Sequence, residues 1–366
     1  MPKAKTSTPV IDPSGFVDGF VEGYLQATNT PGIAVALIYE GQQYFYSFGS
    51  ANVALKTPVT NETIFEIGSI TKVFTAIMLG FKMGSSVFNN PITDYLPYTF
   101  PPNSAITKVT VSQLATHTSG MPKDGGGTPA EQLFTDQPPL TVLTDWWSTG
   151  FTSPPAPAAG TCWQYSNIGF VTLGYVVAGC NPNNYNGLLA DIITGPLKMT
   201  QTGSSNPTGP SAAAGYVGPP NKRHRAKGTA ADLKSSAQDM MTFLEICIYG
   251  QKHSGPHGVG NDISFTQQPI ITNINDCSSG APTKFQMGLA WQISQMTSNG
   301  KSFDLIAKDG ETSLGGFQSW MGVVQDNMGI VLLSNKFMTA PANPPQSLAT
   351  TGKAILQALL DISVTS

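Results

Sequence analysis

Strand-like segments lie near both ends of the chain, while the long middle part has a different pattern. Residues 32–49 read GIAVALIYEGQQYFYSFG, two β-rich runs around Glu40 and Gly41 that predict a hairpin. Strand patterns return late in the chain, at residues 285–293, 302–310, 315–324 and 329–335. Apolar residues at helical spacing predict a helix beside each group, at residues 13–27 and 347–362. We therefore expect an α/β sheet assembled from both ends of the chain.

The middle of the chain reads as loops rich in Pro, Gly, Ser and Asn that separate short helical patterns. These helical patterns lie at residues 110–117, 166–179 and 230–249. We expect residues 1–81 and 281–366 to form an α/β domain, with residues 82–280 inserted as a mainly helical lobe.

Composition and charge exclude several classes of protein. Only 11% of the 366 residues are charged and 40% are hydrophobic, which is typical of a globular protein. A net charge of −3 provides no broad positive field, and the basic cluster at 221–227 is short, so nucleic acid is not an expected partner. No stretch approaches the roughly 20 apolar residues of a membrane helix.

The first residues also lack the apolar core of a signal peptide. We expect a periplasmic or secreted protein whose signal has been removed, with a cytoplasmic protein as the alternative.

The cysteines and histidines show no metal-binding spacing. Free core thiols are the simplest interpretation of the four cysteines, with one or two disulfides as the alternative and three pairings possible if all four bridge. They are Cys162, Cys180, Cys247 and Cys277. His253 and His257 lie in a Gly/Pro-rich loop with no Cys or carboxylate at ligand spacing, so we expect no metal.

A serine and a lysine interrupt the apolar segment FEIGSITKVFTAIMLG at residues 65–80. Its apolar side chains recur at helical spacing and predict a buried face on a helix that opens at Ser69. Lys72 lies off this face and within reach of Ser69, because residues three apart share one side of a helix. A lysine with a lowered pKa can take the serine proton, and the helix start can stabilise an oxyanion. The segment therefore predicts a nucleophilic serine.

The same Ser-x-x-Lys spacing recurs at Ser298 and Lys301. Average residue usage predicts about one chance occurrence in a chain of this length. The second copy lies in a stretch typical of a polar turn, whereas Ser69 opens an amphipathic helix. Context therefore favours Ser69 as the nucleophile.

Two further motifs contain residues that can take part in catalysis. The sequence YSN at 165–167 stands just before a helical pattern. The sequence KDG at 308–310 ends a strand pattern, where a glycine permits a substrate or another backbone to pass closely. KDG also occurs at 123–125 in a loop, but its placement on a strand favours the 308–310 copy.

These three motifs together resemble the serine β-lactamase-like and penicillin-binding superfamily, closest to class C β-lactamases. Penicillin-binding peptidases and family VIII-type esterases are near relatives. The likeness runs nearly end to end, through residues 30–76, 89–97, 109–122, 195–202, 232–244, 287–293 and 329–336. It implies a mainly antiparallel sheet flanked by helices from both chain ends, an all-helical lobe, and an active site in the cleft between them.

The resemblance also implies a mechanism. Ser69 would attack a lactam, ester or peptide carbonyl, with Lys72 and Tyr165 transferring protons and two nearby ammonium groups lowering the pKa of the phenol. The oxyanion hole would be the backbone N–H groups of Ser69 and Glu311. The implied substrate-binding residues are Asn167, Lys308, Asp309, Gly310 and Glu311. The resemblance implies a monomer acting on a small molecule, with no metal or organic cofactor.

The departures from the family pattern concern the binding of a substrate carboxylate. Asp309 stands where the family usually has a threonine, and its charge would repel a carboxylate, while Glu311 adds a second acid. Residues 337–340 read FMTA instead of the family's carboxylate-assisting segment. Three hypotheses follow: a class C-type β-lactamase, a carboxylesterase or D-amino-acid peptidase, and a slowly deacylating penicillin-binding protein.

His117, in ATHTSG, is a further candidate base. A Ser-x-x-Lys site does not need a histidine, so we interpret His117 as a structural or cleft-wall residue.

Overall fold

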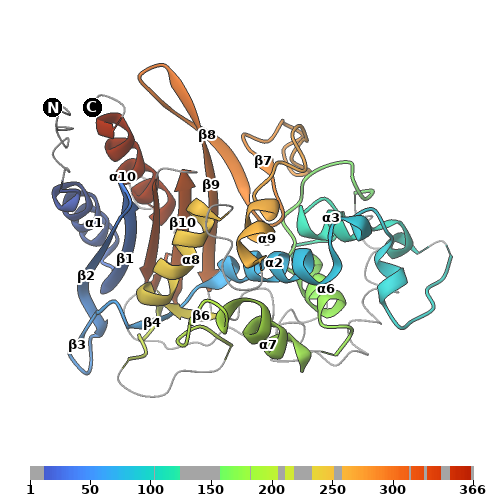
Figure 1. Ribbon diagram of the computed structural model, residues 1–366, viewed down its shortest axis with the longest axis horizontal. Coiled ribbons are helices and arrows are strands. Elements are labelled where there is room, and N and C mark those ends of the chain that lie inside the picture. The colour runs from blue at the N-terminus through green and yellow to red at the C-terminus, as the bar shows by residue number, and fades with distance from the viewer. Residues whose placement is uncertain are drawn as a thin grey trace, which may run out of the picture.

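The computed structural model describes most of the chain (Figure 1). The described residues are 12–102, 104–123, 157–181, 183–204, 211–217, 233–250, 258–312, 315–324, 328–338 and 347–363.

An eight-stranded sheet forms the centre of the fold, in the order β3-β2-β1-β11-β10-β9-β8-β7. Its strands are β1 (Gly32–Tyr39), β2 (Gln42–Asn52), β3 (Thr57–Pro58), β7 (Gln286–Met287), β8 (Gln292–Ser298), β9 (Lys301–Thr312), β10 (Phe317–Val324) and β11 (Met328–Ser334). All paired neighbours run antiparallel. The N-terminal strand β1 pairs with the C-terminal strand β11, Val35 opposite Leu332. This pairing confirms the prediction that both chain ends build one α/β sheet.

Two short two-stranded sheets complete the strands. They pair β4 (Ile64–Glu66) with β6 (Lys234–Ser236), and β5 (Tyr216–Val217) with β12 (Lys336–Phe337). The predicted hairpin between β1 and β2 is confirmed, with Glu40 and Gly41 at φ 50° and 73°. Two consecutive positive φ values are typical of the type I′ turn that matches the twist of a hairpin.

Helices cover both faces of the sheet. Residues 33, 35 and 37 of β1 lie in one apolar cluster with α1 (Ser14–Thr28) and α10 (Leu348–Ser363). The alternate residues 34, 36 and 38 join the other cluster, which includes α8 (Ala237–Tyr249). A strand that is buried on both faces reads as a continuous apolar run, which is what β1 shows.

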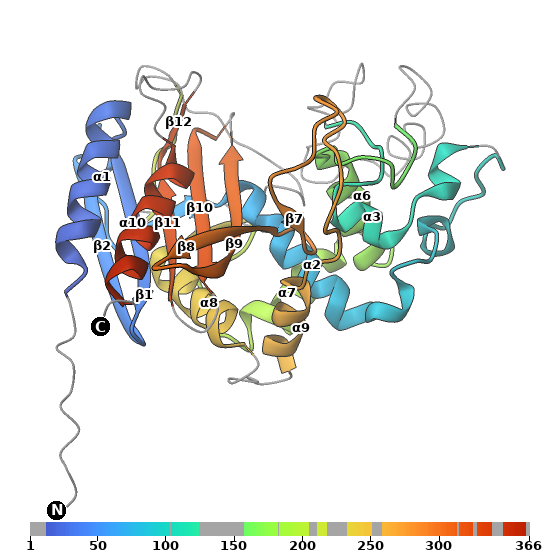
Figure 2. The ribbon, with the colours of Figure 1, turned by 90° about the horizontal axis from the view of Figure 1, so that it is seen from above.

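The other helices of the described residues lie to one side of the sheet (Figure 2). They are α2 (Thr71–Met83), α3 (Val111–Ala115), α6 (Asn167–Val177), α7 (Asn184–Leu189) and α9 (Val259–Thr266). Short helical turns add η1 (Gly68–Ile70), η2 (Ser85–Val87), η3 (Ile92–Tyr95), η4 (Ala105–Lys108) and a π-helical turn, η6 (Ala190–Thr194). Figure 2 shows the sheet at one end of the molecule and α3 and α6 at the other, with α2 between them.

The inserted range contributes to both parts of the molecule. The sequence predicts residues 82–280 as the helical lobe, yet α8 packs on β1 and β11 of the sheet. The helix expected at 230–249 begins only at Ala237, because residues 234–236 pair with β4 instead. Ser236 then caps α8 by accepting the backbone N–H of Asp239. The domain boundaries themselves stay a prediction.

Among the described residues, no helix has both the length and the apolar character needed to cross a membrane.

Candidate active site

Ser69 lies in the 3-10 turn η1, directly before α2, instead of opening the α-helix as expected. This turn closely approaches strand β9. Gly68 has φ +52°, and a Cβ on it would lie 2.5 Å from the backbone N of Glu311. A Cβ on Gly310 would lie 2.1 Å from the backbone O of Ile67. Two glycines therefore let the backbones meet, which brings the segment of Ser69 beside that of Glu311.

Two ionisable side chains contact the hydroxyl of Ser69. Lys72 Nζ donates a hydrogen bond to Ser69 Oγ at 2.9 Å, from one turn further along the chain. Tyr165 Oη donates to the same oxygen at 2.6 Å. Lys72 is fully buried and Ser69 is 8% exposed, so the hydroxyl lies at the boundary between the interior and the solvent. This arrangement suits a nucleophile whose proton is transferred to and from neighbouring side chains.

The start of α6 holds the second motif in place. Ser166 is the N-cap: its Oγ accepts the N–H of Gly169 at 2.8 Å and donates to the backbone O of Pro122 at 2.7 Å. Ser166 is in an extended conformation, so the side chains on either side of it, Tyr165 and Asn167, emerge on the same side. Asn167 Oδ1 accepts a hydrogen bond from Lys72 Nζ at 2.8 Å. The spacing of two residues thus directs both side chains to Ser69 and Lys72.

Lys308 adds a second ammonium group to the site. Its side chain is buried, and its Nζ lies 5.4 Å from the centre of the Tyr165 ring, while Lys72 Nζ lies 5.1 Å from it. Burial raises the pKa of the Tyr165 phenol, and the charge of Lys308 opposes that effect only in part. The expectation that the two ammonium groups lower this pKa is therefore wrong, because desolvation is the larger effect. In the free protein the phenol keeps its proton.

Asp309 forms an ion pair with Lys308. Lys308 Nζ donates to the backbone O of Asp309 at 2.7 Å and to its Oδ1 at 3.2 Å. The Asp309 side chain is 55% exposed, whereas that of Lys308 is 2% exposed. The adjacent ammonium lowers the pKa of Asp309, so its carboxylate is ionised at neutral pH. The positive charge of Lys308 is therefore shared with a carboxylate of the protein itself.

Glu311 completes the third motif. Its backbone lies against Gly68, and its Oε1 accepts a hydrogen bond from Gln318 Nε2 at 3.2 Å on the neighbouring strand. The structure thus brings together all the residues that the sequence assigned to the site: Ser69, Lys72, Tyr165, Asn167, Lys308, Asp309, Gly310 and Glu311.

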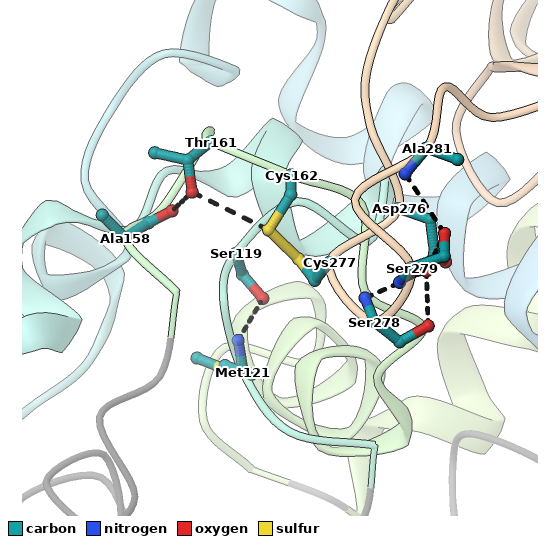
Figure 3. The surroundings of a disulfide bond; sticks show 10 residues. All are labelled: Ser119, Met121, Ala158, Thr161, Cys162, Asp276, Cys277, Ser278, Ser279 and Ala281. Atoms are coloured by element: carbon teal, nitrogen blue, oxygen red, sulfur yellow. Dashed lines mark hydrogen bonds between the residues drawn. A yellow bond between two sulfur atoms is a disulfide. The ribbon is translucent and has the colours of Figure 1, made fainter.

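A disulfide joins Cys162 to Cys277 (Figure 3). Cys180 and Cys247 are free thiols. The interpretation as free thiols is therefore wrong for Cys162 and Cys277, and the alternative of one disulfide is confirmed. Two backbone hydrogen bonds tie the same segments, from Trp163 N to Asn275 O at 2.8 Å and from Cys277 N to Trp163 O at 2.9 Å. The chain just before Tyr165 is thus held both covalently and by hydrogen bonds.

The second Ser-x-x-Lys copy forms a hairpin turn. Ser298 and Lys301 pair across β8 and β9, and Asn299 and Gly300 have φ 48° and 75°. Figure 1 shows this hairpin tip away from α2. Its interpretation as a turn is confirmed.

Several other candidates lie outside the described residues. They are His253, His257, the basic cluster at 221–227, Asp124 and Gly125 of the second KDG, and Thr339 and Ala340. Within the described part of the chain, no group of three or more His, Cys, Asp or Glu side chains could hold a metal ion.

Sequence reasoning missed three residues of the site. Gly68, directly before Ser69, was a visible signal for a close backbone approach. Phe170 lies beside Lys72, with its ring centre 5.8 Å from Lys72 Nζ, and Trp163 lies beside Tyr165, with ring centroids 6.5 Å apart. Their aromatic character is equally typical of an ordinary core, so no local signal sets them apart.

Comparisons with known proteins place this geometry in context. The model of the Beta-lactamase family matches residues 17–350 of the chain. The chain is 28% identical over 253 residues to a beta-lactamase of Yersinia enterocolitica, covering 66% of this chain and 61% of that protein. It is 26% identical over 349 residues to a beta-lactamase of Pseudomonas fluorescens, covering 87% and 92%. A beta-lactamase of Providencia stuartii is 25% identical over 354 residues, covering 89% and 87%.

Proposed function

The chain belongs to the Beta-lactamase family and is a serine hydrolase, and we propose that it hydrolyses the amide bond of β-lactams by a class C-type mechanism. One observation carries the proposal: Lys72 Nζ and Tyr165 Oη contact Ser69 Oγ together, at 2.9 and 2.6 Å. A hydroxyl with two proton-transfer groups in hydrogen-bond reach is prepared for acyl transfer.

Acylation begins with attack of Ser69 Oγ on the lactam carbonyl carbon. Because burial raises the pKa of Tyr165, the phenol holds its proton. Lys72, an ammonium group in the resting site, first releases a proton to solvent, and its free base then accepts the proton of Ser69. As the carbon–nitrogen bond breaks, Tyr165 donates its proton to the leaving nitrogen and regains one from Lys72. The backbone N–H groups of Ser69 and Glu311 stabilise the oxyanion.

Deacylation uses the same groups in the opposite sense. A water molecule attacks the ester carbon, and its proton passes through Tyr165 and Lys72 to Ser69 Oγ as the carbon–oxygen bond breaks. The product leaves as a carboxylate, its proton restores the ammonium group of Lys72, and the site returns to its starting state.

A chromogenic cephalosporin tests this proposal. We expect multiple turnovers and a transient adduct of the mass of the intact substrate, seen by rapid-quench intact mass spectrometry and absent in Ser69→Ala. No turnover together with no adduct contradicts the proposal. A long-lived adduct with little turnover instead indicates a slowly deacylating penicillin-binding protein.

A second candidate function is hydrolysis of esters or D-amino-acid amides that lack a carboxylate. The pairing of Lys308 with Asp309 favours it, because a substrate carboxylate that approaches Lys308 also meets the charge of Asp309. Two like charges about 3 Å apart repel by about 1.4 kcal/mol even at the dielectric constant of water, which is a factor of about 10 in rate. Neutral substrates do not meet this repulsion.

Substrate pairs that differ only in charge separate the two candidates. We compare a carboxylate-bearing cephalosporin with its methyl ester, alongside a short-chain nitrophenyl ester and a D-amino-acid amide. The second candidate predicts preference for the uncharged compounds, and inactivity on them alongside fast cephalosporin turnover contradicts it. Asp309→Thr and Asp309→Asn then raise kcat/KM for the carboxylate-bearing compound about 10-fold and leave the methyl ester unchanged. An equal response of both compounds contradicts the repulsion.

We also propose that the protein works in an oxidising compartment. The Cys162–Cys277 disulfide supports this, since disulfides persist mainly in exported proteins. Maleimide labelling of denatured protein from its native cells, without reductant, reports the number of free thiols. Modification of both Cys162 and Cys277 contradicts the proposal.

A further inference from the structure

His117 has no part in the mechanism above, yet three contacts join it to the segment at 164–166. Its backbone O accepts the N–H of Gln164 at 2.8 Å. Its Nδ1 accepts the N–H of Ser166 at 3.1 Å. Its ring lies over that of Tyr165, with centroids 4.3 Å apart and planes inclined by 33°. His117 therefore holds the backbone on both sides of Tyr165 by hydrogen bonds, and its ring packs on the Tyr165 ring.

The hydrogen bond at Nδ1 determines the protonation of the ring. A nitrogen that accepts a hydrogen bond carries no proton, so neutral His117 has its proton on Nε2. Burial and the charges of Lys72 and Lys308 lower the pKa of His117 well below its ordinary value, in agreement with the neutral form. The lone pair of His117 is already engaged by Ser166, so His117 does not serve as a second base.

The backbone of His117 is also unusual. Its φ is +59°, in the left-handed region that residues other than glycine rarely occupy. Such conformations persist where the surroundings enforce them, and they cluster at functional sites. The side chain is only 1% exposed and also contacts Phe170, with ring centroids 4.9 Å apart. The imidazole is therefore held in one orientation from several sides.

We propose that His117 is a positioning residue that sets the orientation of the Tyr165 phenol and, through Ser166, of the Asn167 amide. The inference rests on the proposed function, since it acts through groups that contact Ser69 and Lys72. Tyr165 Oη reaches Ser69 Oγ at 2.6 Å, and a tilt of the ring would move that oxygen away. Misplacement of a reacting group by about 1 Å is enough to cost on the order of 10²-fold in rate.

Three substitutions separate the contacts of His117. His117→Asn keeps an acceptor near the position of Nδ1 and tolerates a positive φ, but it removes the ring. His117→Phe keeps a ring and removes the acceptor, and His117→Ala removes both. We expect the single-turnover acylation rate to fall about 10²-fold in the alanine variant and about 10-fold in the other two, with little change in substrate binding.

A double-mutant comparison distinguishes positioning from a general loss of stability. In a Tyr165→Phe background, we expect His117→Phe to slow acylation by less than about 3-fold, because the phenol hydroxyl is gone and only the weaker effect through Ser166 on the Asn167 amide remains. Phe88→Leu is the matched control: Phe88 contacts Phe265 with ring centroids 5.4 Å apart and takes no part in the site. It should lower the melting temperature and leave acylation unchanged in both backgrounds. Equal losses from His117→Phe in both backgrounds, or no loss in any His117 variant, overturn the proposal.

The Tyr165 ring provides a readout that does not depend on turnover. In protein with ¹³C-labelled tyrosine, the Tyr165 signal is assigned by its absence in Tyr165→Phe. We expect His117→Ala to shift this signal and to lower the pKa of the phenol, because removal of the imidazole lets water approach. An unmoved signal and pKa overturn the positioning role. The absence of any adduct on Ser69 in the unaltered protein instead contradicts the proposed function, so the two failures are distinguishable.

Discussion

Two stretches of the chain share the Ser-x-x-Lys spacing but lie in different kinds of structure. Ser69 lies in the turn before α2, where Lys72 Nζ donates to its hydroxyl at 2.9 Å. Ser298 and Lys301 face each other across the β8–β9 hairpin as a cross-strand pair. The same separation thus gives a shared helical face in one stretch and two strand ends in the other. The secondary structure, and not the spacing alone, brings a lysine to the serine.

The two serines also differ in their hydrogen-bond partners from distant parts of the sequence. Tyr165 reaches Ser69 from a segment 96 residues away in sequence, and Asn167 contacts Lys72. The Ser298 hydroxyl is buried and has no hydrogen-bond partner among the described residues. A serine becomes a candidate nucleophile when groups from distant parts of the chain converge on it.

Replacing each serine in turn is the strongest way to break this comparison. We expect Ser69→Ala to lower the acylation rate by about 10⁴-fold or more, because the attacking oxygen is lost. Ser298→Ala should keep the rate within about 2-fold of the original, since the turn takes no part in the reaction. Rapid-quench mass spectrometry measures both. If Ser298→Ala were the damaging change, our choice of nucleophile would be wrong.

Replacing the proton-transfer groups should give the next largest effect. Lys72→Ala and Tyr165→Phe should each slow acylation by at least about 10²-fold, the size expected for a lost acid–base group. Lys301→Ala removes the same side chain from the second copy and is the matched control. Single-turnover kinetics on folded variants provide the rates. Equal behaviour of the two lysine variants would mean that Lys72 has no special role.

Removing the disulfide tests how much the cross-link next to the Tyr165 segment stabilises the fold. Cys162→Ser combined with Cys277→Ser should lower the free energy of unfolding by about 2–4 kcal/mol, because the bond closes a long loop. Urea titration measures this change. Cys180→Ser, at a half-buried free thiol, should change it by less than about 1 kcal/mol. Equal losses in the two variants would show that the cross-link itself does not stabilise the fold.

The buried imidazole of His117 should produce the smallest effect, a dependence of stability on pH. Its pKa is well below the ordinary value of 6.5, so below pH 6.5 the unfolded chain binds a proton that the native protein does not. The contribution of the neutral imidazole to the free energy of unfolding is therefore fully present above pH 6.5. It is lost as pH falls, by up to about 1.4 kcal/mol per pH unit. Urea titrations at several pH values should show a shallower loss in His117→Asn, and identical slopes would contradict the assignment.

Local patterns predicted much of the fold because they depend on near neighbours. The β-rich runs of β1 and β2, the Glu40-Gly41 turn and the helical pattern of α2 all follow from short-range spacing. The sequence predicted one buried face on α2, but the helix is buried on every side from Thr71 to Gly80, because the fold surrounds it. The start of α8 did not, because residues 234–236 pair with β4, which lies far away in the sequence. A helical pattern could not reveal that competing partner.

The sequence by itself determined which elements form and which residue types could carry the chemistry. It placed Lys72 one turn from Ser69, since an i to i+3 contact follows from helix geometry alone. Only the tertiary structure decided that Tyr165 contacts this serine, that Lys308 lies beside the Tyr165 ring, that Asp309 pairs with Lys308, and which cysteines join. Contacts between distant segments depend on the path of the whole chain and on the packing of its core, and local spacing contains neither.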